Sequence, residues 1–215
     1  MKRSEKSQQL KKDILDATRD LLLSQGYQKT TIRQITAKVG INSGSLYHFF
    51  RDKDDIFKNI VIETYKEIID YSDIAMKENQ DPAFRYALTR AFEMKAIEKY
   101  NRIAELYHVA YSSWPVTQAM LAINMERKRL FFQSLNPDFT ERDYYNRSLA
   151  LRGMRLSFIS RRLYEGPGNL SDSVAFLIET ALSMFNVPED HIRRLIPKVL
   201  GIIDRESFDL YGFTL

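Results

Sequence analysis

Apolar residues recur three and four positions apart along most of the chain, the spacing that places them on one face of an α-helix. No segment shows the sustained apolar and polar alternation, with β-branched residues and hairpin turns, that is typical of strands. Glycines and prolines interrupt the helical repeats at well-separated points. The pattern therefore predicts an all-α fold.

The first helix is expected over about residues 8–25. It should end at Gly26, because glycine readily adopts the left-handed conformation that follows many helices. The residues of its apolar face are Leu10, Ile14, Ala17, Leu21 and Leu22.

Two short helices are expected next. Thr31 and Gln34 have the spacing of a capping box, so the second helix should begin after Thr31 and stop at Gly40. Asn42 or Ser43 can cap a third helix. The side chains expected inside are Ile32, Ile35, Val39, Leu46 and either Phe49 or Phe50. Two short helices joined by a tight turn containing glycine are typical of a helix-turn-helix.

Beyond Lys53 the repeats lengthen, and roughly six further helices are expected. Thr140 and Ser171 are expected to cap helices over about 141–164 and 171–186. Breaks are expected at Asp81-Pro82, Trp114-Pro115, Asn136-Pro137, Gly166-Pro167-Gly168 and Val187-Pro188. No linker of low complexity separates the two parts, so we expect a domain over 1–57 joined through a continuous helix to a second over 58–215.

Charge is distributed unevenly between these two parts. Residues 1–57 contain 11 basic and 7 acidic residues, whereas the remainder contains 21 of each, so all of the formal surplus of +4 lies in the first part. A basic module beside a neutral body is typical of a protein that binds a polyanion such as nucleic acid. Chance clustering on a solvated face is the alternative that charge alone leaves open.

Several kinds of chemistry are excluded or disfavoured. The chain has no cysteine, which excludes disulfides and thiolate sites and suits a reducing cytoplasm. Its three histidines, at 48, 108 and 191, are too scattered to suggest a metal set, and no phosphate loop, HExxH or strand-nested serine is present. No apolar run approaches the about eighteen residues of a membrane span. We expect a cytoplasmic protein that is not an enzyme and needs no cofactor or metal.

The run from Thr30 to Lys53 resembles the signature of the TetR family of bacterial repressors. The resemblance includes the paired threonines, the small residues that begin the third helix, the Leu46-Tyr47 pair with the aromatic after it, and the lysine that opens the next helix. Upstream it extends to Ile14, Ala17, Gly26 and Tyr27.

This resemblance implies double-stranded DNA as a partner, read by the third helix. The expected base or phosphate contacts are Arg33, Ser43, Gly44, Ser45, Tyr47 and His48, and the expected backbone clamps are Thr30, Thr31, Lys38 and Lys53. Short side chains at 43–45 let a helix end approach base edges, and hydroxyls and cations contact phosphates. For single residues other roles stay open: Thr31 as a cap alone, Tyr47 as partly core, and His48 as simply exposed.

The resemblance also implies that the larger domain forms a homodimer and binds a small effector. The stretches 92–94 and 107–114 are rich in aromatic and small polar residues, a composition that suits a pocket for a hydrophobic or amphipathic ligand. The residues expected to line this pocket are Phe92, Tyr107, His108, Tyr111, Trp114 and Arg155. The expected dimer contacts are Leu151, Phe158, Ala175, Ile178 and Leu182. Packing within one subunit is the alternative for each of these residues. Arg152 and Arg155 can meet an anionic effector or form ordinary ion pairs.

The function expected from these observations is a ligand-responsive repressor that binds a palindromic operator as a homodimer and is released by its effector. The alternative is a DNA-binding protein of the same fold without effector control.

Overall fold

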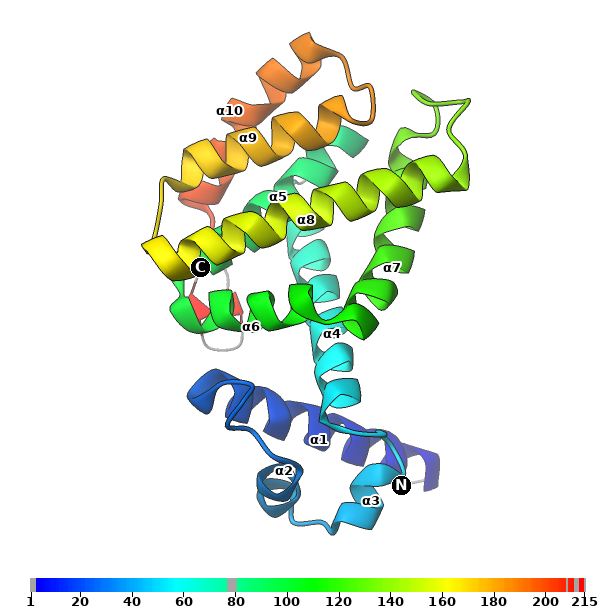
Figure 1. Ribbon diagram of the computed structural model, residues 1–215, viewed down its shortest axis with the longest axis vertical. Helices are drawn as coiled ribbons and strands as arrows, with labels where there is room; N and C mark the ends of the chain where they lie inside the picture. The colour runs from blue at the N-terminus through cyan, green and yellow to red at the C-terminus, as the bar shows by residue number, and fades with distance from the viewer. Residues whose placement is uncertain (1–2, 77–80, 208, 211–212, 215) are drawn as a thin grey trace. The chain divides into compact units, whose positions relative to one another are not determined.

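A computed structural model describes residues 3–76, 81–207, 209–210 and 213–214, and these residues are almost entirely helical (Figure 1). The chain divides into two compact units, Met1–Thr64 and Tyr65–Leu215. The elements in chain order are α1 (Arg3–Gln25), α2 (Ile32–Val39), α3 (Ser43–Tyr47), α4 (Lys53–Ala75), α5 (Pro82–Lys99), α6 (Asn101–Ser112), α7 (Trp114–Phe132), α8 (Glu141–Glu165), α9 (Leu170–Ser183), α10 (Glu189–Arg205), β1 (Asp209–Leu210) and β2 (Phe213–Thr214).

The predicted all-α class is confirmed, with one small addition at the end of the chain. Strands β1 and β2 pair in antiparallel fashion, with Asp209 opposite Thr214 and Leu210 opposite Phe213. Two-residue strands are too short to show the alternation of apolar and polar residues that indicates a strand in a sequence. For this reason the hairpin is absent from the prediction.

The first unit is built around a small apolar core. Helix α1 ends at Gln25 as expected, with Gly26 at φ 83°, and it begins at Arg3, five residues earlier than its apolar repeat suggests. The core side chains of this unit, each less than 2% exposed, include Ile14, Leu22, Ile35, Leu46, Phe50 and Ile56. The three helices α1–α3 and the start of α4 therefore share one hydrophobic centre.

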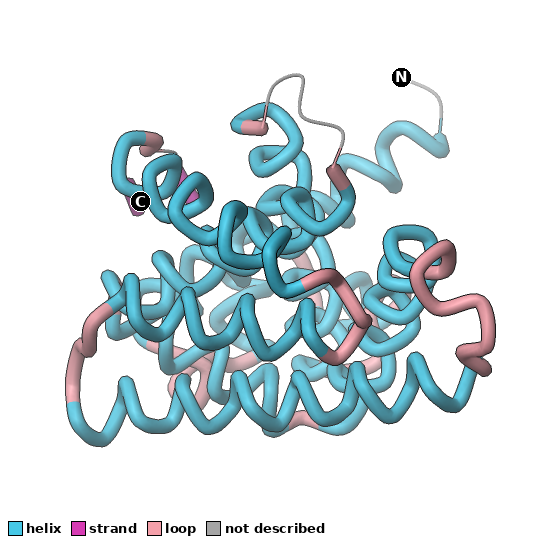
Figure 2. Tube along the Cα trace, turned by 90° about the horizontal axis from the view of Figure 1, so that it is seen from above, coloured by secondary structure: helices cyan, strands magenta, loops and turns pink. Residues whose placement is uncertain are grey.

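Helix α5 forms the centre of the second unit. Almost all of its residues are buried, charged ones included, because α9 and α10 pack on it together with α6, α7 and α8. Figures 1 and 2 show α8 and α9 running side by side, and α6 also packs against α8. In a helix surrounded in this way, a polar side chain is costly unless it finds a partner inside the protein.

The helix boundaries follow the predicted caps, with two exceptions. Asp81 caps α5 ahead of Pro82, and Thr140 forms a capping box with Asp143 at the start of α8. The prediction of Ser171 as a cap is wrong: α9 begins at Leu170, and the carboxamide oxygen of Asn169 accepts the hydrogen bond of the Asp172 amide. The break between α5 and α6, at Tyr100, has no proline or glycine to announce it.

Helix α4 is continuous through residue 57, the predicted domain boundary. The two compact units divide at residue 64, within the same helix. Within the described ranges, no helix has the length and apolar character required to cross a bilayer.

Candidate nucleic-acid interface

The turn between α2 and α3 is fixed by three local devices. The Thr31 hydroxyl accepts the amide of Gln34 at 3.3 Å while the Gln34 side chain accepts the Thr31 amide at 2.9 Å, which completes the predicted capping box. Gly40 ends α2 at φ 76°, in the left-handed region where a side chain is strained. Asn42 then caps α3, because its Oδ1 accepts the Ser45 amide at 2.8 Å.

Helix α3 is anchored from below and exposed above. Leu46 is completely buried and Phe50 follows it into the core, whereas the Tyr47 side chain is 54% exposed. Ser43, Gly44 and His48 are exposed as well, and Ser45 is half-buried. The first turn of the helix therefore presents small residues to solvent, beside one large hydroxyl-bearing ring. Such an end is slim enough to approach the floor of a groove.

Gly44 is close to the capping side chain. A Cβ built at this position lies 3.3 Å from the Asn42 Oδ1, tighter than ordinary van der Waals contact. A side chain at position 44 would therefore press on the cap of α3 as well as widen the exposed helix end.

Lys53 supports the loop before α2. Its Nζ donates to the carbonyl oxygens of Tyr27 and Thr30, both at 3.0 Å, and lies 4.0 Å from the centre of the Tyr27 ring. Burial lowers the pKa of Lys53. Two of the three ammonium protons are thus committed to the protein, so Lys53 shapes the interface whether or not its third proton contacts a phosphate.

The prediction of Thr30 as a DNA clamp needs correction. Its side chain is completely buried, and its hydroxyl donates to the Gly26 carbonyl oxygen at 2.8 Å. The hydroxyl therefore closes the turn after α1 and has no access to a phosphate. Paired threonines in sequence look equivalent, yet Thr30 faces inward and Thr31 faces solvent.

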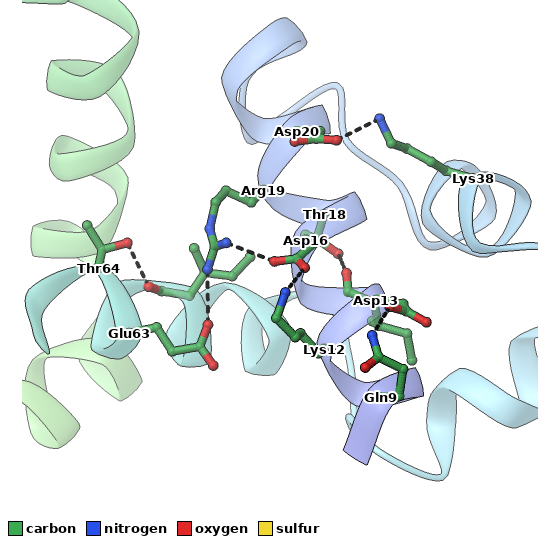
Figure 3. Close-up of polar contacts among 12 residues, drawn as sticks. Gln9, Lys12, Asp13, Asp16, Thr18, Arg19, Asp20, Lys38, Glu63 and Thr64 are labelled. Carbon is green, nitrogen blue, oxygen red and sulfur yellow. Dashed lines mark hydrogen bonds and ion pairs between the residues drawn. The ribbon is translucent and has the colours of Figure 1, made fainter. Parts of the chain in front are cut away.

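Several charges around α1 are already paired within the first unit. Figure 3 shows Arg19 between Asp16, at 2.9 Å, and Glu63, at 3.0 Å. Lys38 reaches back from α2 to Asp20 at 3.0 Å. Both partners of this last pair are largely exposed, so the pair is weak and a phosphate can compete for the lysine. Arg33 is exposed and forms no ion pair with any described residue.

The structure therefore gathers most of the predicted DNA contacts on the exposed side of α2 and α3. The exposed members are Thr31, Arg33, Lys38, Ser43, Gly44, Tyr47 and His48. Ser45 and Lys53 are half-buried at the edges of the set, and Thr30 lies beneath it. The individual roles of these residues stay predictions.

The residues predicted to bind an effector do not form one group. Arg155 and Tyr111 lie together, since both reach Glu93: the Arg155 Nη1 at 3.4 Å and the Tyr111 hydroxyl at 3.2 Å. The Tyr107 ring lies 6.2 Å from that of Tyr111, and His108 is half-buried on the same helix. Phe92 is completely buried, 4.9 Å from the Tyr71 ring.

Trp114 lies elsewhere, largely exposed at the start of α7. It lines an open groove of about 930 Å³ between α7, the start of α8 and the loop that joins them. The groove lining mixes apolar, polar and charged side chains, among them Leu121, Met125, Arg129, Phe139 and Tyr145.

The sequence interpretation singled out Arg152 and Arg155 but missed the buried charges of two other helices that lie with them. Arg90 and Glu93 on α5, Lys128 on α7 and Arg152 and Arg155 on α8 are each at most 7% exposed. A signal was present in the middle of α5, where Arg90 and Glu93 are the charged residues of a run over 86–94 that is otherwise suited to a core. Nothing local marks Lys128, whose neighbours along α7 are partly charged and exposed.

Three of the predicted dimer contacts also need correction. Leu151, Ile178 and Leu182 are at most 2% exposed, because each packs inside its own subunit. Phe158 and Ala175 remain half-buried on the outer sides of α8 and α9. The Phe158 ring lies 6.0 Å from that of Phe176, which is 54% exposed. The solvent-facing stripe of these helices is thus one or two positions away from the predicted one.

Known proteins resemble the N-terminal part of the chain in sequence and the whole chain in fold. Residues 14–60 match the sequence pattern of a family described as bacterial regulatory proteins, tetR family. A stretch of 47 residues is 38% identical to the HTH-type transcriptional repressor Rv1474c of Mycobacterium tuberculosis, covering 22% of this chain and 25% of that repressor. A stretch of 60 residues is 42% identical to the HTH-type transcriptional regulator HbdR of an Aromatoleum species, covering 26% of each chain. The matches thus span about a quarter of these relatives.

Solved structures resemble the whole chain in fold. RolR in complex with resorcinol has a TM-score of 0.69 at 17% identity, covering 90% of this chain and 96% of that one. FadR of Thermus thermophilus in complex with lauroyl-CoA has a TM-score of 0.61 at 12% identity, covering 83% and 96%. Together these comparisons lead to one conclusion: residues 14–60 match the tetR family of bacterial regulatory proteins, and the chain as a whole shares the fold of RolR and FadR.

Proposed function

We propose that this protein is a DNA-binding transcription regulator, acting as a repressor that occludes its operator. The observation that carries the proposal is the exposed end of α3. There, Asn42 caps a helix of small residues, Leu46 anchors it, and Tyr47 stands exposed beside it. In this arrangement α3 enters the major groove while residues of α2 and the flanking loops contact phosphates.

We propose further that the regulator acts as a homodimer through α8 and α9. The outer sides of these helices carry large apolar side chains in solvent, among them Leu149 and Phe176. Exposed apolar surface of this kind favours self-association. A two-fold dimer would direct two α3 helices at half-sites of a palindrome, about one DNA turn or 34 Å apart.

The effector is proposed to be a small molecule bound in the second unit. Two proteins of similar fold have been solved with ligands, resorcinol in RolR and lauroyl-CoA in the Thermus thermophilus FadR. A ligand that prefers the conformation unfit for DNA lowers operator affinity by its preference between the two states.

The test is selection of sites from a random duplex pool by the full chain. We expect a palindrome with half-sites about one turn apart, bound more weakly as salt rises. Tyr47→Ala should lose enrichment. Tyr47→Phe, which keeps the ring and removes only the hydroxyl, measures how much of the loss belongs to a phosphate hydrogen bond. Absence of any enriched motif, or equal enrichment by Tyr47→Ala, would overturn the proposal.

Homodimer formation is tested separately by sedimentation of Phe176→Asp. We expect the variant to sediment as a monomer and to lose affinity for the palindrome while retaining its helical content. A variant that still sediments as a dimer would exclude this face as the interface.

A further inference from the structure

The second unit contains a group of buried cations that its carboxylates do not balance. Arg90, Lys128, Arg152 and Arg155 are each between 1% and 7% exposed. Among the described residues, Glu93 is the one buried carboxylate that acts on all four of them. We call these five residues the cation cluster.

The single carboxylate is shared between two arginines. Its Oε2 accepts Arg90 Nη1 at 2.7 Å and Arg155 Nη1 at 3.4 Å, and its Oε1 accepts the Tyr111 hydroxyl at 3.2 Å. The Nε atoms of Arg90 and Arg155 are buried, and neither has a hydrogen-bond partner among the described residues. Each arginine thus retains an unused donor after Glu93 has been satisfied.

Among the described residues, the other two cations have only neutral hydrogen-bond partners. Lys128 Nζ donates to the Ser148 hydroxyl at 3.0 Å, the one hydrogen bond it forms with described residues. Arg152 donates to the Thr117 hydroxyl at 2.9 Å and to the Ala110 carbonyl oxygen at 2.8 Å. Burial, together with repulsion from Arg155 and Arg90, lowers the pKa of Lys128 well below its ordinary value.

A second group of buried charges in the same unit is compensated by ion pairs. Glu98 accepts Arg161 Nη2 at 2.5 Å and the amide of Gly168 at 3.0 Å, and its carboxylate lies 3.7 Å from Arg162. Arg162 and Glu98 are both buried, one against one, and Arg161 extends toward solvent. The cation cluster departs from this pattern by up to three positive charges. Buried charge without a counter-charge is costly, so a fold that retains it has a use for it.

We propose that the cation cluster binds the carboxylate of a small organic acid, and that this anion is the effector. The second statement rests on the proposed function; the first does not. The anion supplies the missing counter-charge and accepts from donors that the protein leaves unused. Aromatic rings line the cluster: the guanidinium of Arg152 lies 4.1 Å from the centre of the Tyr111 ring, and that of Arg90 lies 4.7 Å from the Tyr65 ring. A small aromatic acid would meet rings as well as cations there.

The test uses benzoate and benzamide, which share size and shape and differ in charge. Binding to the full-length protein is measured at constant ionic strength by calorimetry and by the shift in melting temperature, without DNA. We expect benzoate to bind and raise the melting temperature, and benzamide to do neither. Lys128→Met keeps the length of the side chain and removes its charge, and Lys66→Met, at an exposed position of α4, is the matched control.

Lys128→Met should weaken benzoate binding about tenfold or more, since a charge-assisted hydrogen bond is lost. The same variant should melt at the same or a higher temperature without ligand, because it removes an uncompensated buried charge. Lys66→Met should change neither quantity. Equal effects of benzoate and benzamide, an unchanged benzoate response in Lys128→Met, or a lower melting temperature of that variant would each overturn the proposal.

The two proposals fail separately. If benzoate binds as expected but leaves operator affinity unchanged, the cation cluster is an anion site and effector control through it is wrong. If operator binding is relieved by neutral compounds alone and benzoate does not bind, the regulator stands and the anion site does not.

Discussion

The two units of this protein place their cations in opposite ways. In the first unit Arg33, Lys38 and Arg51 are exposed, and no charged residue that the structure describes there is buried. Among the described residues of the second unit five cations are buried, four of them in the cation cluster and the fifth, Arg162, paired with Glu98. Exposed cations can meet a polymer of phosphates without losing their hydration in the free protein. Buried cations are costly until a small anion reaches them. The same residue types thus indicate two different anionic partners.

The strongest test of this contrast is Glu93→Gln, which removes the counter-charge from the cation cluster. We expect a loss of about 3–5 kcal/mol in the free energy of unfolding, because buried cations lose their carboxylate. Urea denaturation measures this loss. Glu126→Gln is the control, since its carboxylate is 56% exposed beside Arg129 and should matter little. Equal stabilities of the two variants would show that the cations are solvated or neutral.

Arg33→Ala tests the exposed side of the comparison. We expect duplex affinity to fall about tenfold, and the slope of log affinity against log salt to become shallower by about one. Unfolding free energy should change by no more than about 0.5 kcal/mol, since the side chain is exposed. Arg194→Ala, an exposed arginine of α10, should leave DNA affinity unchanged. If both variants lost affinity alike, binding would follow net charge and not the α2–α3 surface.

Loss of the α3 cap should lower stability less than Glu93→Gln does, and it should also weaken DNA recognition. Asn42→Ala removes the hydrogen bond to the Ser45 amide and should cost about 1 kcal/mol of unfolding free energy. Asn42→Ser keeps a capping oxygen and should retain most of it. Operator affinity is expected to follow the same order in an anisotropy titration. Equal operator affinity of the wild type, Asn42→Ser and Asn42→Ala would mean that the cap does not preorganise the end of α3.

Proton uptake gives the finest test of the cation cluster. Lys128 is faced by Arg90 and Glu93 of α5 and by Ser148 and Arg155 of α8, and burial lowers its pKa. A bound anion raises that pKa again, so at a pH between the free and bound values the complex takes up part of one proton. Benzoate affinity should therefore fall as pH rises from the free-state pKa to the bound-state pKa, and level off above it. Calorimetry in buffers of different ionisation enthalpy measures the uptake, which Lys128→Met should abolish.

The first unit could be predicted from sequence almost completely because its signals are local. The capping box of Thr31 and Gln34 and the stop at Gly40 act within a few residues, and the structure contains both. Thr30 is the exception, since its direction depends on the turn after α1 and not on its neighbours in sequence.

The second unit could be predicted in class and in most of its helix boundaries, but not in its packing. Which side of α8 and α9 faces solvent depends on α5 and α6, so Leu151 and Ile178 were assigned to the wrong surface. The cation cluster joins α5, α7 and α8 across 20 to 62 residues of sequence, as in the contacts of Lys128 with Ser148 and of Arg155 with Glu93. Spacing along one helix carries no information about such meetings.

Recognition of DNA by α3 is tested most sharply by the affinity of the full chain for its selected duplex, measured by anisotropy at two salt concentrations with and without benzoate. We expect binding that weakens steeply with salt, is lost in Tyr47→Ala, and is relieved by benzoate in the wild-type protein but not in Lys128→Met. Binding that is insensitive to salt and survives Tyr47→Ala would show that α3 does not recognise DNA.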